Sequence, residues 1–513
     1  MRRAPFAVAL AAFLTFLVTG GGRIVGSDEL TMFELARAMA HGGIAVPAGA
    51  TLDGPDGRHY SKNTAGQGVL ALPFVVAGDL AARAAGFSGA RAELAARCVA
   101  STFNAFVTAL LLAVLFVALR RFRAGPGPTF AAVVLLGFTT PLWIYAKSFM
   151  AEPLEGLGLL LALTGAARAG AAPAPADASQ GRWEAALGAC LAVSVKLGML
   201  PLVLAALTAA GFRRLAAWRL PLAGVAVALA GHAFYNAARF GTPFETGYGA
   251  QASLTAFTTP LAVGVYGLLL SSGKGIAWFA PFVWLVPAGL TAMLRSRQHS
   301  SAARHGDDVR RAGWASLAVW AVGLTLYGRF QHWGGDGSWG PRYLVPLLPL
   351  AAIPVAFALE GASRLRRRIA WLVGAIGFVV TLGGVGIYFG AQMREAGDFP
   401  YTLALEDPHF MEASHWNPRF TPIAAHWRML ARNLAEHARG ETPRLGTGGE
   451  VDPRTGLTHE EQHTLLHAID VWWLYATYAG LPRAPLLAVA LGLAVAAAWG
   501  WSRAWRSARE DTA

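Results

Sequence analysis

Long apolar runs separated by short polar segments dominate the pattern along this chain. A membrane-spanning helix needs about 20 mostly apolar residues, and ten runs qualify, at residues 5–20, 97–119, 128–146, 152–169, 219–238, 276–294, 312–328, 343–360, 370–390 and 484–502. A longer apolar stretch between Arg182 and Arg214 is interrupted by Lys196 and Pro201, which predicts two short helices that meet near Lys196. The pattern therefore predicts an all-α polytopic membrane protein with about twelve transmembrane helices.

Clusters of basic residues beside the apolar runs predict the orientation of the chain. Cytoplasmic loops of membrane proteins are enriched in Lys and Arg. If the N-terminus lies inside, so do the C-terminal tail and the loops at 120–127, 170–183, 212–218, 295–311 and 361–369. All of these except the Ala- and Pro-rich 170–183 carry several arginines. The number of spans and their orientation therefore support each other.

Composition agrees with a membrane protein and accounts for the net charge. The chain is 55% hydrophobic and 14% charged, whereas about a quarter of the residues of an ordinary soluble protein are charged. The net charge of +13 comes mainly from loop arginines, so it indicates topology rather than binding to nucleic acid. The two cysteines, Cys98 and Cys190, lie in apolar stretches and cannot form a disulfide framework or a thiolate metal cage.

The segments predicted on the outer face are unusually rich in Gly, Trp, His, Asp and Tyr. They comprise residues 21–96, 147–151, 239–275, 329–342 and 391–483. Loops of such length are commonly functional. Within the first of them, residues 67–83 are apolar but interrupted by glycine, and we expect them to lie flat at the membrane interface.

Acidic residues occur at the predicted outer boundary of the membrane. Asp28 and Glu29 open an amphipathic helix in GSDELTMFELARAMAHGG, and Glu152 begins the fourth span, with Glu155 one turn deeper. A carboxylate in such a place can act as a general base on a hydroxyl. A structural alternative stays open, because Ser27 is a good helix N-cap and acidic residues suit the first turn of a helix. Glu152 can equally be a solvated boundary residue.

Four cations recur on the same side, at Lys62, Lys196, Lys274 and Arg342. Each alone is also typical of an interfacial residue that snorkels to the lipid headgroups. Lys274 and Arg342 lie in Gly-rich turns where backbone N–H groups can approach an anion, and Arg can bind a phosphate through two hydrogen bonds. The string SSGKG resembles part of a P-loop, but it lacks the preceding glycine and lies on the outer face, so we reject an ATPase.

One further motif has two interpretations. Residues 459–463 read HEEQH, which matches the H-E-x-x-H pattern of zinc metalloproteases, and His467 follows one turn later. Thr458 and Glu461 also form a capping box that opens a helix. The surroundings are polar and offer no obvious core to hold a metal site rigid. We favour helix capping and keep a membrane zinc peptidase as an alternative.

Five strings, taken together in their order, resemble the bacterial GT-C glycosyltransferases, membrane enzymes that use polyprenyl-phosphate-linked sugars. That family includes protein O-mannosyltransferases and the lipid A aminoarabinose transferase. The strings, which span most of the chain up to about Pro349, are GSDELTMFELARAMAHG, DGRHYSKNTAGQGVLALPF, YNAARFGTPFETGY, LLLSSGKGIAWFAPF and HWGGDGSWGPRYLVPLLPL. The resemblance implies a GT-C-like helical bundle with amphipathic interfacial helices in the first outer loop. It implies that Asp28 is the base, with Glu29 as substitute and Glu152 as a second acidic residue.

The residues and the resemblance together predict an inverting glycosyltransferase of the inner membrane. We expect a polyprenyl-phosphate-linked sugar as donor, and a hydroxyl of a lipid, glycan or protein as acceptor, on the extracytoplasmic face. The four cations would bind the donor phosphate. Sugar or acceptor contacts are predicted for Tyr60, Tyr248, His332, Trp333 and Trp339, although interfacial aromatic residues also serve as belt anchors. No cofactor is required, since the cations can neutralise the phosphate, and a divalent metal is compatible with the site.

This interpretation divides the chain into three parts. They are a transmembrane catalytic region at 1–390 with its first outer loop at 21–96, an extracytoplasmic hydrophilic segment at 391–483, and a last transmembrane helix with a basic cytoplasmic tail at 484–513. The competing class is a lipid or solute transporter or flippase. Ionisable residues in mid-helix and repeat symmetry would favour a transporter, but the sequence has few of the former and no visible repeat.

Overall fold

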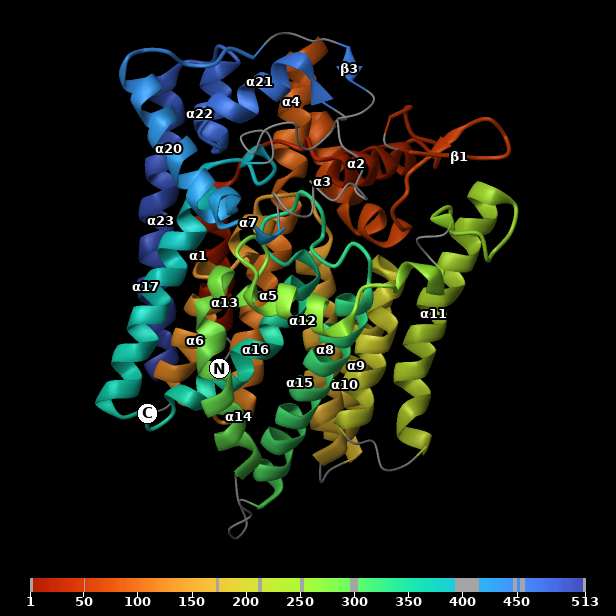
Figure 1. The fold of residues 1–513 in the computed structure, drawn as a ribbon, viewed down its shortest axis with the longest axis vertical. Coiled ribbons are helices and arrows are strands. Elements are labelled where there is room, and N and C mark those ends of the chain that lie inside the picture. Colours follow the sequence, from red (N-terminus) through yellow and green to blue (C-terminus); the bar gives the residue numbers. More distant parts are fainter. Residues whose placement is uncertain are drawn as a thin grey trace.

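The computed structural model describes residues 3–49, 51–171, 175–210, 215–249, 253–295, 303–392, 415–445, 450–452 and 457–510. The chain forms an elongated bundle of helices (Figure 1). Both termini lie at one end of the bundle, and the opposite end carries the first loop and the helices between residues 415 and 478. We call this opposite end the outer end, after the orientation predicted from the sequence. The predicted all-α class is therefore confirmed.

Each of the twelve predicted spans corresponds to one helix or to consecutive helices. These are α1 (Arg3–Thr19), α5 (Thr102–Arg121), α6 (Pro126–Phe138) with α7 (Leu142–Ala146), α8 (Glu152–Ala171), α9 (Pro175–Val195), η1 (Leu197–Met199) with α10 (Leu200–Ala209), α11 (Leu215–Phe240), α13 (Ile276–Phe279) with η4 (Pro281–Leu285) and α14 (Val286–Arg295), α15 (Ala303–Arg329), η6 (Arg342–Leu347) with α16 (Leu348–Leu359), α17 (Arg364–Gly386) and α23 (Arg483–Glu510). The break at Lys196 separates α9 from η1, as the sequence predicts.

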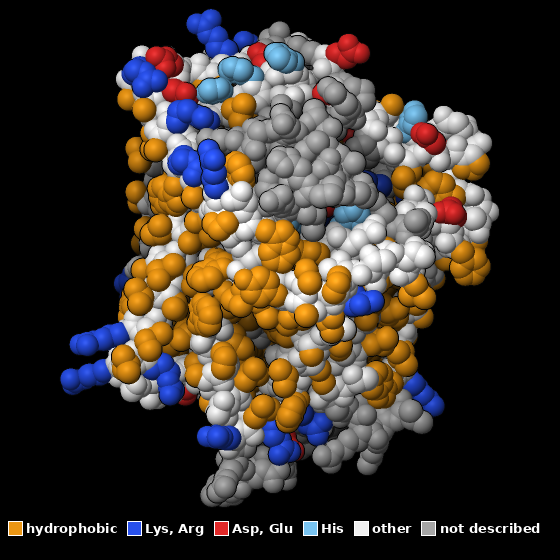
Figure 2. All heavy atoms as spheres, in the orientation of Figure 1, with side chains coloured by type: hydrophobic (Ala, Val, Ile, Leu, Met, Phe, Trp, Pro, Cys, Tyr) orange, Lys and Arg blue, Asp and Glu red, His pale blue; other side chains and the backbone are white. Residues whose placement is uncertain are grey.

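The surface of the bundle shows the distribution of side chains expected in a bilayer. Among the residues that the structure describes, six helices are long and apolar enough to cross a membrane, and five shorter helices are also apolar. Figure 2 shows a broad apolar band around the middle, with Lys and Arg at both ends and with His and most of the visible acidic residues at the end away from the termini. Exposed apolar side chains on the predicted spans include Trp371 on α17 and Val495 on α23, which are 81% and 69% exposed. The chain is a multi-pass membrane protein.

Close helix packing within the bundle depends on small residues. Without a hydrophobic driving force between helices in lipid, association relies on tight van der Waals contact, which small side chains permit. Gly165 on α8 and Gly188 on α9 lie directly against the opposing backbone, and a Cβ at either place would approach it within 3.0 Å. The two helices therefore pack along their whole length, and α8 carries acidic residues at its outer end.

The first loop folds into helices that stand on the outer end of the bundle. It contains α2 (Ser27–Ala40), the antiparallel strands β1 (Leu52–Asp53) and β2 (His59–Tyr60), α3 (Ala65–Ala84) and α4 (Gly89–Ala100). α4 continues into α5 to give 33 residues of nearly continuous helix, about 50 Å at 1.5 Å per residue. That length exceeds the hydrocarbon core, about 30 Å thick, so α4 extends beyond the span predicted at 97–119.

The segment predicted to lie flat at the interface forms α3. It packs against α2 and α4, and it exposes the apolar side chains Val69, Leu70, Val76 and Leu80. By length and composition α3 would also qualify as a span. Its flat placement stays a prediction.

One apolar helix was not expected. α12 (Leu261–Leu270) lies within 239–275, which the sequence analysis assigned entirely to an outer loop, after a short turn η3 (Leu254–Ala256). Ten residues of helix rise only about 15 Å, so α12 is too short to cross the bilayer. It packs against α15 and α13 and ends in the turn that carries Lys274.

The hydrophilic segment predicted at 391–483 is largely helical where it is described. It contains η8 (Pro418–Phe420), α20 (Pro422–Ala438), α21 (His459–His467), α22 (Trp472–Tyr478) and the paired strands β3 (Val451–Asp452) and β4 (Leu457–Thr458). Residues 393–414, 446–449 and 453–456 lie outside the described residues. α20 packs on α17, and α22 packs on α23, so the segment sits over the outer end of the bundle.

Candidate active site

The start of α2 fixes two adjacent carboxylates in different surroundings. Gly26 is the N-cap, and Glu29 accepts hydrogen bonds from the backbone N–H groups of Gly26 at 2.9 Å and Phe149 at 2.7 Å. Ser27 is thus the first helical residue rather than the cap. Burial raises the pKa of Glu29 to about 7, although these N–H groups oppose the rise. One Glu29 oxygen therefore joins α2 to the turn before α8, and the other closes the N-terminus of α2.

Asp28 instead points at two cations from distant parts of the chain. Its carboxylate lies 2.6 Å from the Lys62 ammonium and 2.7 Å from a terminal guanidinium nitrogen of Arg342. Burial acts to raise the pKa of Asp28, but Lys62 and Arg342 outweigh it and hold that pKa well below its usual range. The Lys62 ammonium also lies 3.4 Å from the Ser27 hydroxyl.

Arg342 joins Asp28 to a second carboxylate. Its Nε donates to Glu152 at the first position of α8. Glu152 is 1% exposed, and its other oxygen has no hydrogen-bond partner among the described residues. We call Asp28, Lys62, Glu152 and Arg342 the ion-pair cluster. It brings together predicted residues from α2, the loop after β2, α8 and η6.

Lys196 lies one layer deeper than the ion-pair cluster. Its ammonium is 3.8 Å from Glu155 and 4.9 Å from the centre of the Tyr343 ring. Tyr343 directly follows Arg342 and stacks on Tyr327 with ring centres 4.8 Å apart. Lys196 therefore contacts the cluster through neighbouring residues and not directly.

Lys274 has a different set of partners from the other predicted cations. Its side chain is buried, and its ammonium donates to the carbonyl oxygens of Asp336 at 2.6 Å and Ser338 at 2.7 Å. Burial lowers the pKa of Lys274 to about 7. The ammonium thus braces the Gly-rich loop immediately before Arg342, and its predicted contact with the donor phosphate stays a prediction.

The five predicted sugar or acceptor contacts are scattered. Trp333 and Trp339 are each 1% exposed, with Trp333 packed against Trp416 and Trp339 against His426. Such burial leaves no open ring face, so the geometry does not favour their role in sugar stacking.

The remaining three predicted contacts differ in their distance from the cluster. Tyr60 is buried in the first-loop hairpin, where its hydroxyl donates to Asp56 at 2.6 Å. Tyr248 is 38% exposed, and its pKa rises to about 12 through burial and through the nearby charge of Asp28. The His332 ring lies 3.6 Å from Asp336. Tyr248 and His332 therefore lie closer to the ion-pair cluster than Tyr60 does.

Several residues that shape the site were not singled out from the sequence. Asn63 donates to the Thr31 hydroxyl at 2.9 Å, and Arg239 donates to the Ser61 carbonyl at 2.7 Å. These bonds fix the loop that carries Lys62 to α2 through Asn63 and to α11 through Arg239. Asn63 follows Lys62 in the string HYSKNTAGQ, so its place beside a predicted cation was the only available signal.

The turn between α7 and α8 is held from three sides. Asn104 donates to the Met150 carbonyl, and Gln67 donates to the Phe149 carbonyl, each at 2.6 Å. Glu29 accepts from the Phe149 N–H. All three side chains are buried. The first residue of α8, Glu152, is therefore presented by a rigid turn.

The HEEQH motif opens α21, and the capping interpretation is confirmed. The Thr458 hydroxyl accepts from the Glu461 N–H, and Glu461 accepts from the Thr458 N–H, both at 3.1 Å. His467 pairs with Glu436 at 3.2 Å. Within the part of the chain that the structure describes, no three His, Cys, Asp or Glu side chains are grouped in a way that could hold a metal ion.

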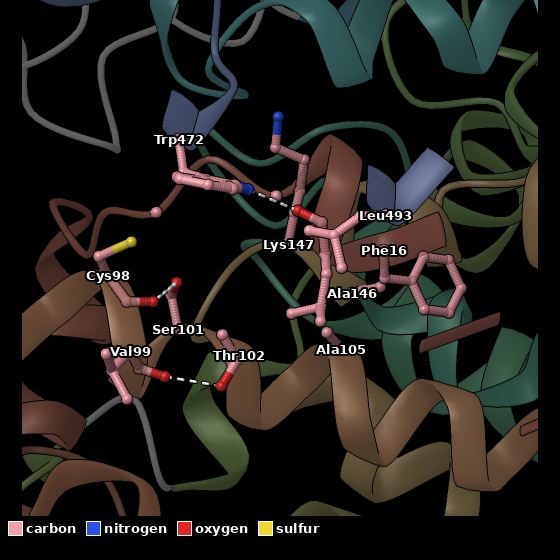
Figure 3. A pocket seen from close by; sticks show the side chains of 13 residues that line it. Phe16, Cys98, Val99, Ser101, Thr102, Ala105, Ala146, Lys147, Trp472 and Leu493 are labelled. Atoms are coloured by element: carbon pink, nitrogen blue, oxygen red, sulfur yellow. Dashed lines mark hydrogen bonds between the residues drawn. The ribbon is translucent and has the colours of Figure 1, made fainter. Parts of the chain in front are cut away.

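An apolar cavity of about 230 Å³ lies beside the turn between α7 and α8 (Figure 3). Its walls come from α1, α4, α5, α22 and α23, and they include Phe16, Cys98, Thr102, Trp472 and Leu493. Lys147 reaches its rim, but the ammonium of that residue is paired with Asp470 at 2.9 Å. No residue of the ion-pair cluster lines this cavity, so it is separate from the charged site.

Comparison with solved structures identifies the architecture around this site. Crystal structures of ArnT from Cupriavidus metallidurans match this chain with a TM-score of 0.50, both with undecaprenyl phosphate bound and in the apo state. The match covers 91% of this chain in both cases and 76% and 75% of ArnT. ArnT is a lipid A aminoarabinose transferase with the GT-C fold. This chain has the GT-C fold.

The likeness to ArnT is one of fold, since sequence identity is 18% and 17%. No family model matches the sequence, and no curated protein does. The resemblance predicted from five short strings is therefore confirmed by the arrangement of the helices.

Proposed function

We propose that this protein transfers a sugar from a polyprenyl-phosphate donor to an acceptor hydroxyl at the outer end of its helix bundle. The observation that carries the proposal is the ion-pair cluster on a GT-C fold. Lys62 and Arg342 come from different outer loops and converge on Asp28. A phosphate leaving group needs cations and an acceptor hydroxyl needs a base, and the cluster contains both.

In this proposal the donor phosphate displaces carboxylates from the two cations. The Arg342 guanidinium already binds oxygens of two different side chains, Asp28 and Glu152, and a phosphate can offer it two oxygens in the same way. Charge grows on the phosphate oxygens as the sugar leaves, so a fixed cation stabilises the transition state more than the ground state. These cations suffice without a metal.

The reaction we propose is a direct displacement. An acceptor oxygen forms a bond to the anomeric carbon as the bond from that carbon to the phosphate oxygen breaks, and the phosphate leaves with the electron pair. The acceptor proton passes to Asp28. Lys62 and Arg342 hold the Asp28 pKa low in the free protein. When phosphate oxygens share these cations, the carboxylate becomes more basic, so donor binding would activate the base. One base gives inversion at the anomeric carbon.

The lipid part of the donor needs an apolar path to the cluster. α3 starts directly after the loop that carries Lys62, and its exposed apolar side chains Val69, Leu70, Val76 and Leu80 face outward. We propose that this surface guides the isoprenoid chain, in keeping with the hydrophobic contact that such a chain requires. Lys196, Tyr248 and His332 surround the cluster and are proposed as further donor or acceptor contacts.

The function is tested with purified protein and a radiolabelled polyprenyl-phosphate sugar. We expect release of polyprenyl phosphate that depends on the ion-pair cluster. A comparison of cell-envelope glycolipids and glycans between a deletion strain and the wild type should show one product missing. Unchanged envelope glycans together with a stable donor in vitro would contradict the proposal.

Replacing Arg342 by Lys tests the phosphate contact. The substitution keeps the charge but loses the two parallel hydrogen bonds that guanidinium makes to phosphate or carboxylate oxygens. We expect a loss of at least about tenfold in turnover, equivalent to ~1.4 kcal/mol of transition-state stabilisation. Steady-state transfer is the measurement, and Arg329→Lys at the outer end of α15 is the matched control. Unchanged turnover and donor affinity would leave Arg342 as a headgroup anchor.

The side of the membrane on which the cluster lies is tested by cysteine labelling. In a variant that lacks Cys98 and Cys190, new cysteines at Thr51 and Glu441 should react with an impermeant thiol reagent in cells whose outer membrane is permeable. A cysteine at Arg367, in a predicted inner loop, should react only after lysis. Labelling of position 367 in intact cells would reverse the orientation inferred from the arginine clusters.

A further inference from the structure

Asp336 presents a carboxylate beside the ion-pair cluster that the reaction proposed above does not use. It lies six residues before Arg342 in the Gly-rich loop, and its side chain is 39% exposed. A Cβ added at Gly335 would lie 2.8 Å from the Cβ of Arg342, so the loop passes directly against that residue. The charges of Asp28 and Arg342 also act on Asp336. The Asp336 carboxylate is 3.6 Å from His332, which is itself 8% exposed. A partly exposed carboxylate that is paired with one histidine therefore lies beside the arginine that binds the predicted base.

The loop holds Asp336 in a backbone conformation that side chains other than glycine seldom adopt. Its φ is 54°, and Gly335 before it has a φ of 69°. The Lys274 ammonium fixes this turn by donating to the carbonyl oxygens of Asp336 and Ser338. Strained backbone of this kind persists only where the surroundings determine it strongly, and it is concentrated at functional sites. Lys274 thus positions the Asp336 carboxylate.

We propose that Asp336 binds the acceptor and selects one with several hydroxyl groups, a sugar rather than a single alcohol. The inference rests on the proposed glycosyl transfer and names its acceptor class. An ionised carboxylate only accepts hydrogen bonds and can accept from two donors at once. While Asp28 receives the proton of the attacking hydroxyl, Asp336 accepts a hydrogen bond from another hydroxyl of the same molecule. An alcohol with one hydroxyl cannot satisfy both carboxylates.

Burial raises the pKa of Asp336, and the charge of Asp28 adds to this rise, while His332, Lys274 and Arg342 oppose it. The groups that face the carboxylate therefore include both signs of charge. A carboxylate in this environment gains from a hydrogen-bond donor more than a solvated one does, because the donor replaces lost water. This electrostatic environment supports binding of the acceptor at Asp336. The position of Asp336 beside Arg342 supports the same role independently.

The test compares two probes of similar apolar size, octyl β-glucoside and 1-octanol, with water as the third acceptor. Purified protein is given a radiolabelled polyprenyl-phosphate sugar, and each product is counted. For Asp336→Asn we expect the ratio of transfer to octyl glucoside over transfer to octanol to fall about tenfold, the effect of one hydrogen bond to a charged group. The KM for octyl glucoside should rise more than kcat falls. Asp336→Glu should restore part of the preference.

Asp53→Asn provides the matched control. Asp53 also pairs with a histidine, His59 at 2.8 Å, but it is 85% exposed on the first-loop hairpin. We expect the acceptor preference of this variant to equal that of the wild type. An unfolding midpoint equal to that of the wild type would show that Asp336→Asn is folded.

Lys274→Met separates two roles for that lysine. If Lys274 positions Asp336, the glucoside-to-octanol ratio falls as it does for Asp336→Asn. If it binds the donor phosphate, transfer to all three acceptors falls together and the ratio stays constant.

Other outcomes distinguish the two proposals. An equal loss of transfer to glucoside, octanol and water in Asp336→Asn, or no loss at all, would overturn the acceptor role. A wild-type protein with no preference for the glucoside over octanol would overturn the proposed acceptor class. Absence of polyprenyl phosphate release with every acceptor would instead contradict the glycosyltransferase proposal itself.

Discussion

Asp28→Asn should abolish most transfer while the protein stays folded. The change keeps the shape of the side chain but removes the charge that pairs with Lys62 and Arg342 and that is proposed to take the acceptor proton. General base catalysis typically contributes about 10²–10⁴ in rate, and we expect a loss of that order in steady-state transfer. The loss of stability should be smaller than for the more deeply buried Asp470, because the Asp28 side chain is 19% exposed and Arg342 keeps Glu152 as a partner.

Glu29→Gln is the matched control for this prediction, since it makes the same chemical change one residue along. Glu29 accepts from two backbone N–H groups, and hydrogen bonds to charged groups contribute about 1.5–3 kcal/mol. Glu29→Gln should therefore lower stability as well, but reduce transfer far less than Asp28→Asn does. Equal rates for Asp28→Asn and the wild type would leave Asp28 as a structural residue. A larger catalytic loss in Glu29→Gln would favour the substitute base.

The contrast between these neighbours was partly visible in the sequence. Consecutive residues of a helix differ by about 100° around its axis. Glu29 shares a face with Met32, Phe33 and Ala36, all of which are buried. The burial of Glu29 thus follows from the helical spacing of the apolar residues of α2. The partners of Asp28 do not follow, because Arg342 lies 314 residues away, and only the packed bundle brings the two together.

Helix spans were predictable because they depend on local sums of hydrophobicity. A run of about 20 apolar residues is long enough to cross the bilayer as a helix, and each predicted span has a corresponding helix. α12 was not predicted because its ten residues are fewer than the number that such a search requires.

Roles of single cations were less predictable than spans. Lys62 and Lys274 both lie in polar loops between apolar segments, and both were expected to bind phosphate. In the structure the Lys62 ammonium is paired with a carboxylate, whereas the Lys274 ammonium is bonded to backbone carbonyls. Composition and spacing do not determine the direction in which a lysine side chain in a loop points. The different partners of Lys62 and Lys274 therefore depend on tertiary contacts.

The hydrophilic segment contributes a buried charge that the sequence did not reveal. Asp470 lies 2.7 Å from Arg23 and 2.9 Å from Lys147, and the three side chains are at most 5% exposed. Arg23 also stacks between the rings of Tyr388 and Tyr475, at 4.9 and 4.8 Å. This group joins the end of α1, the turn before α8 and the segment before α22. It therefore anchors the predicted extracytoplasmic part to the turn that presents Glu152.

Asp470→Asn should destabilise the protein by about 3–5 kcal/mol, the usual cost of leaving buried charges without their partner. Equilibrium unfolding in mixed micelles measures the effect. Burial acts to raise the pKa of Asp470, but Arg23 and Lys147 lower it overall. Because the folded pKa is depressed, the stabilisation is present above the unfolded pKa of about 3.9 and is lost as the pH falls below it. The difference between wild type and variant should therefore shrink in acid.

Two comparisons decide whether the paired charge, and not packing, is responsible. Glu441→Gln removes an exposed ion pair with Arg439, and it should leave the unfolding midpoint unchanged. Replacing Arg23 and Lys147 by Met together with Asp470→Asn removes all three charges, and this variant should be more stable than Asp470→Asn alone, because no buried cation is left unpaired. If the triple variant is the least stable of all, the apolar contacts of Arg23 with its two tyrosines dominate, and the charge argument fails.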